Sequence, residues 1–513
     1  MSERFTSASD LRRSYDLVIV GAGPAGLAAA ATASGFGLSV LLADENGAPG
    51  GQIYRGITRS SEADRRRLGP DYAAGKKLSA AFAESAAAYT LGALVWSVAP
   101  TDEETPDADY PLEVGISLGG VARAIGAQRV LLATGAIERP FPIPGWTLPG
   151  VMSAGAAQIL LKTSALAPSG RTVIAGSGPL LYLLASQLIA AGAPPVALVD
   201  TTPRKNWRVA LPDFPAFAMS SYAAKGLKLL FDVAKRIRVI RNVSALEAVG
   251  GDKFETLIVT RTNGTMERID ADLLLLHQGV APNLNLSSAA GCALEWDEKQ
   301  ALFRPKRDEW LESSEAGISI AGDGGGIVGA QASVIEGEIA GLVAAFRLSR
   351  ISKEMFAQRG AELKKRLASV LRGRAFLDRL FRPADEFRVP QRDDAIVCRC
   401  EEVSAGRVRA TAALGVQGPN QMKAFLRCGM GPCQGRLCGL TVSEMIAQAR
   451  GVSPADVGYY RLRPPVKPVP LREFAAMPQS DAAITAVAGF VERSVEKGSA
   501  AGSLEPDNRI VER

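Results

Sequence analysis

The chain has 513 residues, 47% of them hydrophobic, and a formal net charge of +6. Such a length suits roughly three domains. The modest charge, without a basic tail, argues against nucleic-acid binding. No apolar run reaches the ~18 residues that a membrane-spanning helix needs, and the polar N-terminus lacks the apolar stretch of a secretory signal. Five of the six cysteines fall within residues 398–438, unlike a secreted disulfide framework. We therefore expect a cytoplasmic protein.

The first predicted element is an apolar strand at residues 16–21, which runs into Gly21-Ala-Gly23-Pro-Ala-Gly26 and an alanine-rich helix. Strand, GxGxxG and helix in this order are typical of a dinucleotide fingerprint. The three glycines serve the tight turn, the approach of the pyrophosphate and close helix–strand packing. A second strand ends at Asp44, where a carboxylate is expected to accept hydrogen bonds from the ribose hydroxyls. The sequence predicts an adenine-nucleotide site; the alternative is a glycine turn without a ligand.

Two later segments favour FAD over NAD. Residues 318–326 give a strand, an acid and a glycine loop before a helix expected at 330–346. They resemble the late flavin motif of glutathione-reductase-type flavoproteins, in which the aspartate, here Asp323, meets the ribityl chain; turn capping is its alternative role. Residues 130–136 resemble the ATG segment of the same superfamily. The predicted nucleotide-binding residues are Gly21, Gly23, Pro24, Ala25, Gly26, Asp44, Glu45, Gly51, Gln52, Thr134, Gly135, Gly322 and Asp323.

A second strand–turn–helix begins at Thr172 and contains Gly176-Ser-Gly178. It has the topology of a nested NAD(P)H domain, but Leu181 stands where the third glycine belongs. We expect a retained nucleotide fold without a ligand, with nicotinamide binding as the alternative. Disulfide reductases of this superfamily carry a redox CxxxxC after their GG pair. The corresponding segment here, residues 50–55, contains no cysteine, which excludes dithiol chemistry at that position.

Three other features have mainly structural interpretations. His277, the one histidine, ends an apolar strand and is more typical of a structural residue than of a flavin-facing catalyst. Cys292 lies in an apolar segment and is expected in the core. Residues 347–382 combine basic residues with helical leucine and phenylalanine spacing, which predicts amphipathic connector helices. Their charged side is expected to face solvent, and a docking surface for a partner is the alternative.

Four cysteines carry the most specific signal: Cys398-Arg-Cys400, then Cys428-Gly-Met-Gly-Pro-Cys433. Structural zinc knuckles favour CxxC pairs, so CxC with CxxxxC is unusual for zinc. Flanking glycines let backbone N–H groups approach the sulfurs, which helps to set an iron–sulfur potential. The pattern resembles the [2Fe-2S] domain of bacterioferritin-associated ferredoxin. We predict a [2Fe-2S] cluster on these four residues, with zinc and free thiols as alternatives. Cys438 is expected one turn into the next helix, beside the cluster.

Together, these features resemble a group formed by the large subunits of opine oxidases, the B subunits of hydrogen cyanide synthases and the alpha subunits of D-hydroxyproline and related proline dehydrogenases. Residues 144–158 and 463–469 look characteristic of that group, and the likeness spans about residues 14–475. It implies an α/β fold with two nested Rossmann-like domains and a small helical cluster domain. The expected parts are 1–150 and 271–346 for FAD, 151–270 for the degenerate nucleotide fold, 347–395 as connector, 396–455 for the cluster and 456–513 as extension.

The resemblance also implies a function. This chain would be the electron-transfer subunit of an amine or opine dehydrogenase, paired with a smaller glycine-oxidase-like flavoprotein that oxidises the C–N bond. Further expectations are an FMN at the subunit interface, a small third iron–sulfur subunit, and a quinone or electron-transfer protein as acceptor, through which the complex would meet a membrane. ATP in the FAD site is a lesser alternative. Two other hypotheses stay open: an NAD(P)H-dependent reductase that feeds a protein partner, and a scaffold subunit.

Overall fold

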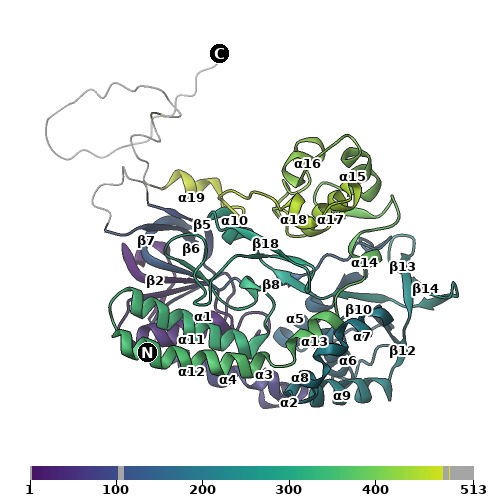
Figure 1. Ribbon diagram of the computed structural model, residues 1–513, viewed down its shortest axis with the longest axis horizontal. Helices are drawn as coiled ribbons and strands as arrows, with labels where there is room; N and C mark the ends of the chain where they lie inside the picture. Colours follow the sequence, from purple (N-terminus) through teal and green to yellow (C-terminus); the bar gives the residue numbers. More distant parts are fainter. Residues whose placement is uncertain (1–2, 102–108, 478–484, 486–513) are drawn as a thin grey trace, which may run out of the picture.

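A computed structural model describes residues 3–101, 109–477 and 485 (Figure 1). Most of the C-terminal extension, residues 478–484 and 486–513, lies outside them. The described part has the predicted α/β architecture with two large sheets: the first is mixed, because β5, β6 and β7 pair antiparallel, and the second is parallel. A smaller helical unit packs on one side of them (Figure 1).

The first sheet has the order β1-β4-β3-β2-β7-β6-β5, with β20 beside β7. Strand β2 is parallel to both of its neighbours, β3 and β7. The chain order therefore reverses at β2, and ligands bind at the carboxyl ends of strands at such a switch point. The strands are β1 Arg4–Phe5, β2 Ser14–Val20, β3 Val40–Asp44, β4 Ala88–Leu91, β5 Leu94–Pro100, β6 Leu112–Leu118, β7 Val121–Leu132 and β20 Ile318–Ile320.

Two helices, α1 (Pro24–Gly35) and α11 (Ala330–Arg347), pack side by side on this sheet and form a core with it. They approach closely because small residues line the contact: a Cβ on Gly337 would lie 2.1 Å from the carbonyl oxygen of Ala25. The observed α11 agrees with the helix expected at 330–346. Helix α12 (Lys353–Leu371) packs on α11 and is followed by α13 (Arg374–Leu380), as the connector pattern predicts.

The second sheet is parallel throughout, in the order β12-β11-β10-β16-β9. Helices flank it, and a three-stranded antiparallel sheet, β13-β14-β15, extends from it. The strands are β9 Val151–Ser153, β10 Thr172–Ser177, β11 Ala197–Asp200, β12 Arg238–Ile240, β13 Val243–Val249, β14 Thr256–Arg261, β15 Met266–Asp270 and β16 Leu273–Gln278. The helices are α5 Ala154–Ser164, α6 Pro179–Ala190, α7 Arg204–Ala210, α8 Phe214–Ala218 and α9 Ser221–Ala234, with the 3₁₀ turn η2 Leu211–Asp213.

The cysteine-rich unit consists of a short β-ladder and helices around its own apolar core. Helix α15 (Ala405–Ala412) follows this ladder, and Ser404 caps its N-terminus through the backbone N–H of Arg407. The unit rests on the flavoprotein part: the indole N–H of Trp146 donates to the carbonyl oxygen of Ile396 at 2.7 Å. Its elements are β21 Ile396–Cys398, β22 Val403–Ser404, α15 Ala405–Ala412, α16 Pro419–Leu426, α17 Gly439–Arg450 and α18 Pro454–Val457.

Candidate functional site

The three predicted nucleotide motifs meet at the carboxyl end of β2. Gly21 has φ +108°, and a Cβ there would lie 2.4 Å from the carbonyl oxygen of Ala133, next to the ATG segment. A Cβ on Gly26 would lie 1.8 Å from the carbonyl oxygen of Gly21, so only glycine lets the helix sit this close to the strand. The late loop η3 (Gly322–Gly325) touches both segments, because Gly322 packs against Ala25. The motifs thus form one cradle.

Asp44 holds the glycine loop from behind. Its carboxylate accepts hydrogen bonds from the backbone N–H of Ala22 (2.6 Å) and from both N–H donors of Asn46 (2.7 and 2.8 Å). A carboxylate has about four acceptor positions, so room remains for a ribose hydroxyl. The neighbouring Glu45 pairs with Lys467, which the sequence did not single out. Burial lowers the pKa of Lys467, while Asp44 acts in the opposite direction.

The residues around η3 fit a bound nucleotide. Asp323 caps the approach to α11, because its Oδ1 accepts from the backbone N–H groups of Val328 and Gly329, both at 2.8 Å. The capping alternative for Asp323 is therefore observed, and Oδ2 has no hydrogen-bond partner among the described residues. The side-chain oxygen of Asn283 is buried without a partner, beside the backbone of Gly135. An orphaned acceptor in this position is what a ligand donor would satisfy.

The glycine pair before Gln52 closes the other side of the cradle. Gly51 has φ +60°, and a Cβ there would lie 2.7 Å from the Cα of Gly23. The side chain of Gln52 is exposed, but its carbonyl oxygen accepts a hydrogen bond from Nζ of Lys162 at 3.1 Å. Burial, together with the charge of Arg55, lowers the pKa of Lys162 to about 7. No pattern in the sequence singles out this lysine, since it looks like any lysine on an amphipathic helix.

In the second nucleotide fold, the protein's own side chains take the places and hydrogen bonds that a nucleotide would need. Leu181 is fully buried in the core between α6 and the sheet. The acid at the end of β11, Asp200, accepts a hydrogen bond from the hydroxyl of Tyr182 at 2.6 Å and one from the backbone N–H of Thr202 at 2.9 Å. In a nicotinamide site this acid would bind the ribose hydroxyls. In this protein the hydroxyl of Tyr182 already donates a hydrogen bond to that carboxylate.

His277 lies under the second glycine loop. Its Nδ1 is 2.6 Å from Glu138 Oε1, and the ring is buried. The same carboxylate accepts from the backbone N–H of Gly155. On the other side, the ring contacts the position a Cβ would take on Gly178. These contacts favour the structural interpretation. Cys292 is buried, as expected, and its thiol lies 3.5 Å from the hydroxyl of Ser313.

The four predicted metal ligands come together, and Cys438 joins them. Cys398, Cys428 and Cys438 are buried, and Cys400 and Cys433 form a second, partly exposed pair. Hydrogen bonds with the thiols of Cys428 and Cys438, and then with backbone N–H groups, lower the pKa of Cys398 to about 2. Cys438 is the N-cap of α17 and does not lie one turn inside that helix, because the helix starts at Gly439.

Glycines and tyrosines shape the surroundings of the sulfurs. A Cβ on Gly431 would lie 2.3 Å from the Cβ of Cys400. The Tyr460 ring lies against Gly429 and Gly435, with its hydroxyl 4.0 Å from the Cys438 sulfur. Five soft thiols with glycine-exposed N–H groups suit an iron–sulfur cluster. As the side chains stand, the described residues contain no group of three or more Cys, His, Asp or Glu that could hold a metal ion. A cluster would require the thiols to turn toward a common centre.

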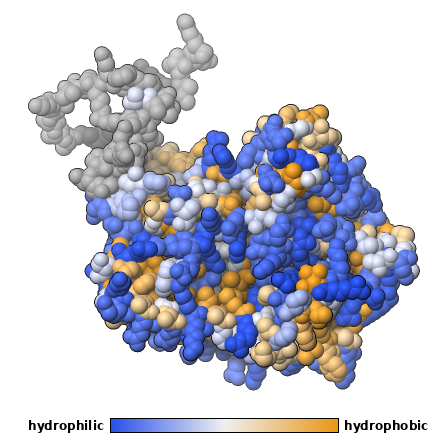
Figure 2. Space-filling view, viewed as in Figure 1, coloured by the Kyte–Doolittle hydropathy of each residue, from blue (hydrophilic) through white to orange (hydrophobic). Residues whose placement is uncertain are grey.

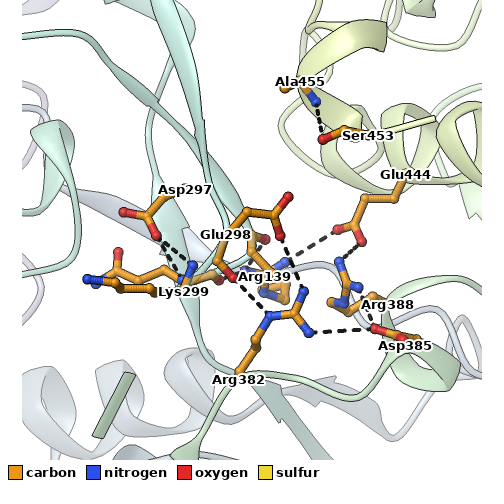
Figure 3. A network of polar contacts seen from close by, with 12 residues as sticks. Arg139, Asp297, Glu298, Lys299, Arg382, Asp385, Arg388, Glu444, Ser453 and Ala455 are labelled. Carbon is orange, nitrogen blue, oxygen red and sulfur yellow. Dashed lines mark hydrogen bonds and ion pairs between the residues drawn. The ribbon is translucent and has the colours of Figure 1, made fainter. Parts of the chain in front are cut away.

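A buried ion network joins this unit to the rest of the protein (Figure 3). Glu444 of α17 pairs with Arg388, from α14 (Asp385–Arg388), and lies 3.7 Å from Arg139. Arg139 follows directly on β8 (Ala136–Glu138) and donates to the carbonyl oxygens of Gln300 and Ala301. Burial raises the pKa of Glu444 although both arginines act to lower it. Sequence reasoning missed this network because its members are far apart along the chain.

Comparison with known proteins identifies the scaffold. Residues 15–350 match the family of pyridine nucleotide-disulphide oxidoreductases. The chain is 49% identical over 484 residues to the A-type subunit of an opine oxidase from Rhizobium meliloti, covering 94% of this chain and 91% of that protein. The chain belongs to this oxidoreductase family, in the branch of the A-type opine oxidase subunits. Residues 393–478, which include the cysteines, match the sarcosine oxidase A3 domain.

Two further similar proteins agree with this assignment of the family. Hydrogen cyanide synthase subunit HcnB of Pseudomonas protegens is 31% identical over 484 residues, covering 91% of this chain and 98% of that one. A crystal structure of L-proline dehydrogenase from P. horikoshii has the same fold, with a TM-score of 0.64 at 21% identity, covering 92% of this chain and 79% of that one. The family match supports FAD as a cofactor of a flavin-dependent oxidase subunit. Among the described residues, no helix is both long and apolar enough to cross a membrane.

Proposed function

We propose that this chain is the electron-transfer subunit of a multi-subunit flavin-dependent amine or opine dehydrogenase. In this role it receives electrons from a partner flavoprotein that oxidises an amino-acid-derived C–N bond. It delivers them to an external acceptor, a quinone or an electron-transfer protein. The names of its relatives, an opine oxidase and an L-proline dehydrogenase, support this substrate class.

The observation that carries the proposal is the gathering of five thiols in one unit fastened to the flavoprotein part. Cys398, Cys400, Cys428 and Cys433 would hold a [2Fe-2S] cluster. Bound there, it would supply one-electron chemistry next to the two-electron chemistry of a flavin. The backbone around Gly429 would donate to the sulfurs and so set the potential. Cys438 would stay packed beside the ligands.

The nucleotide cradle supports FAD more directly than ATP. Thr134, Gly135 and Asp323 line the part that a flavin would occupy, and the orphaned oxygen of Asn283 lies among them. An adenine nucleotide without a flavin would leave that acceptor unsatisfied. We propose that Gly21, Gly23 and Gly26 receive the pyrophosphate, and that Asp44 and Glu45 face the ribose.

Two other routes for flavin electrons have little support. The segment directly after the glycine pair, residues 50–55, contains no cysteine, so a reductase-type dithiol is lacking there. In the second fold, Tyr182 lies on Asp200 and Leu181 fills the place of a glycine. This disfavours the alternative, an NAD(P)H-dependent reductase. Rapid bleaching of the flavin by NADH alone would support that alternative and contradict the proposal.

The proposal is tested in the complex with Cys433→Ser. We expect the amine substrate to reduce flavin as in the wild type, while transfer to the external acceptor falls to background. Cys292→Ser is the matched control, since it makes the same exchange in the flavoprotein core, outside the cysteine-rich unit. Normal transfer by Cys433→Ser would remove the cysteine unit from the electron path.

The partner can be identified by co-purification. We expect a smaller glycine-oxidase-like flavoprotein that carries the amine pocket, with an FMN at the interface and a small third iron–sulfur subunit. The partner's pocket would then identify the amine. Recovery of the chain alone with full amine dehydrogenase activity would contradict this division of labour.

A further inference from the structure

Exposed apolar side chains gather on the helices that cover the second sheet. Of the eighteen large hydrophobic residues that are exposed in the described structure, seven fall within residues 207–231. The exposed fractions reach 54% for Trp207, 68% for Leu227 and 70% for Phe231. We call this surface the α7–α9 face. Its apolar residues are Trp207, Val209, Leu211, Phe214, Met219, Leu227 and Phe231.

Helix α9 shows that these residues are not displaced core residues. Val233 is buried in the core of the second domain, and Leu229 and Leu230 pack partly against it. Leu227 and Phe231 lie on the opposite side, where Ala224, Lys228 and Lys235 are also exposed. Since residues at i, i+3, i+4, i+7 and i+11 share one side of a helix, α9 presents to solvent a side on which apolar residues alternate with lysines.

Basic residues are interleaved with this apolar surface. Residues 204–236 contain seven lysines and arginines but only two aspartates, and Asp213 is already paired with Arg379 at 2.9 Å. Most of the cations carry no counter-charge: no ion pair involves Arg208, Lys228, Lys235 or Arg236 among the residues that the structure describes. Figure 2 shows hydrophobic and hydrophilic residues side by side at the lower edge of the molecule, where Figure 1 places α8 and α9.

We propose that the α7–α9 face docks on the surface of an anionic lipid bilayer. Short amphipathic helices with aromatic and leucine residues on one face and lysines beside them lie in the headgroup region. The lysine stems reach past the apolar residues and keep their ammonium groups among the lipid phosphates. Aromatic residues and methionine are common in protein–protein interfaces as well, but lysine is depleted there, so the lysines favour a lipid surface over a protein partner. Four lysines lie within 204–236 here.

Docking through this face is independent of the proposed electron path and adds an orientation to it. Figure 1 shows α8 and α9 at the lower edge of the molecule and the helices α15–α17 at its upper right, with α7 between them. A chain docked through the α7–α9 face would therefore turn its cysteine-rich unit toward the aqueous phase. Such an orientation favours a water-soluble electron-transfer protein as the acceptor over a quinone inside the bilayer.

The test is flotation of the purified complex with vesicles of phosphatidylcholine, with and without phosphatidylglycerol. We expect binding to the anionic vesicles only, with release as salt screens the attraction. The double variant Lys228→Gln/Lys235→Gln should bind roughly thirtyfold more weakly, since each lysine near an anionic surface contributes about a factor of five. Leu227→Ser/Phe231→Ser should also weaken binding. Leu414→Ser, an equally exposed leucine on the cysteine-rich unit, is the matched control and should bind like the wild type.

Four results would overturn the proposal. The first is equal recovery with neutral and anionic vesicles, and the second is no binding at low salt. The third is a similar loss of binding for Leu414→Ser. The fourth is loss of a partner subunit from Leu227→Ser/Phe231→Ser while vesicle binding stays unchanged, which would make the face a contact between subunits. All the substituted side chains are exposed, so the fold is expected to survive, and flavin content would confirm it.

Discussion

Lys162 is a buried lysine beside the nucleotide loop, and burial lowers its pKa. Its ammonium group donates to the side-chain oxygen of Gln158 and to the carbonyl oxygen of Gln52, and no carboxylate pairs with it among the described residues. A lysine without a counter-charge loses stabilising hydration on burial, which lowers its pKa. The residue is thus poised to change protonation near neutral pH, next to the backbone that closes the cradle.

The free energy of unfolding should therefore depend on pH through Lys162. Its pKa in the folded protein, about 7, lies below the usual 10.5, so between these values the unfolded chain binds the extra proton. Stability should rise by up to about 1.4 kcal/mol per pH unit from pH 7 to 9. Urea unfolding at both pH values should show a smaller rise for Lys162→Met. The exposed control Lys353→Met should keep the wild-type rise in the free energy of unfolding. If Lys162→Met shows the same rise as the wild type, the pKa of Lys162 is not depressed.

Sequence reasoning was strongest for residues whose role is local. The positions of Gly21 and Gly26 follow from the backbone alone, and the structure places them where the fingerprint predicts. Lys162 and Lys467 could not be found this way, because their contacts with Gln52 and Glu45 join segments more than a hundred residues apart. The role of Asp323 was ambiguous, because an aspartate before a helix can cap the helix or bind a ligand, and the sequence pattern is the same in both cases.

At the scale of the element, α1 depends on glycine at one position and not at another. A Cβ on Gly26 would meet the carbonyl oxygen of Gly21, whereas one on Gly35 would meet nothing within 4 Å. Both glycines belong to the same helix, so they form a matched pair.

We expect Gly26→Ala to push α1 away from β2 and to lower the flavin retained after desalting by at least about tenfold, with ~1–3 kcal/mol lost from stability through overpacking. Gly35→Ala should retain flavin and gain up to about 1 kcal/mol, since alanine suits a helix better than glycine. Absorbance of released flavin and thermal melts would measure both. Equal flavin content in the two variants would mean that the cradle does not hold the cofactor.

The start of α17 shows how element boundaries limit prediction. The spacing of Cys433 and Cys438 suggested that Cys438 lies within the helix, but the helix begins one residue later. As the N-cap, Cys438 reaches the same buried site as Cys398 and Cys428. Glycines on either side of these residues allow turns whose course a sequence pattern does not define.

At the scale of the whole molecule, the buried network around Glu444 joins the cysteine-rich unit to the flavoprotein part (Figure 3). Removing one partner of a buried ion pair leaves an uncompensated charge and costs roughly 3–5 kcal/mol. Glu444→Gln should therefore destabilise the protein by that order in urea unfolding and speed proteolysis between the two parts. Glu298→Gln, which alters the solvent-exposed pair with Arg382, should cost less than about 1 kcal/mol. Similar effects of the two variants would show that the network does not fasten the unit.

The overall architecture was more predictable than the contacts within it. Two strand–glycine–helix units and a cysteine cluster define the order of the parts, because each signal is contained in a short segment. How the cysteine-rich unit sits on the sheets depends on side chains such as Trp146 and Arg139, which carry no recognisable pattern. The α7–α9 face also escaped prediction, since an exposed apolar stripe and a buried one have the same spacing.

The central claim is that the thiols around Cys398 hold an iron–sulfur cluster through which this chain passes electrons onward. The most direct measurement is the metal and acid-labile sulfide content of the anaerobically purified chain. We predict iron and sulfide in equal amounts, both lost in Cys433→Ser and retained in Cys292→Ser. Zinc in place of iron, without acid-labile sulfide, would contradict this claim.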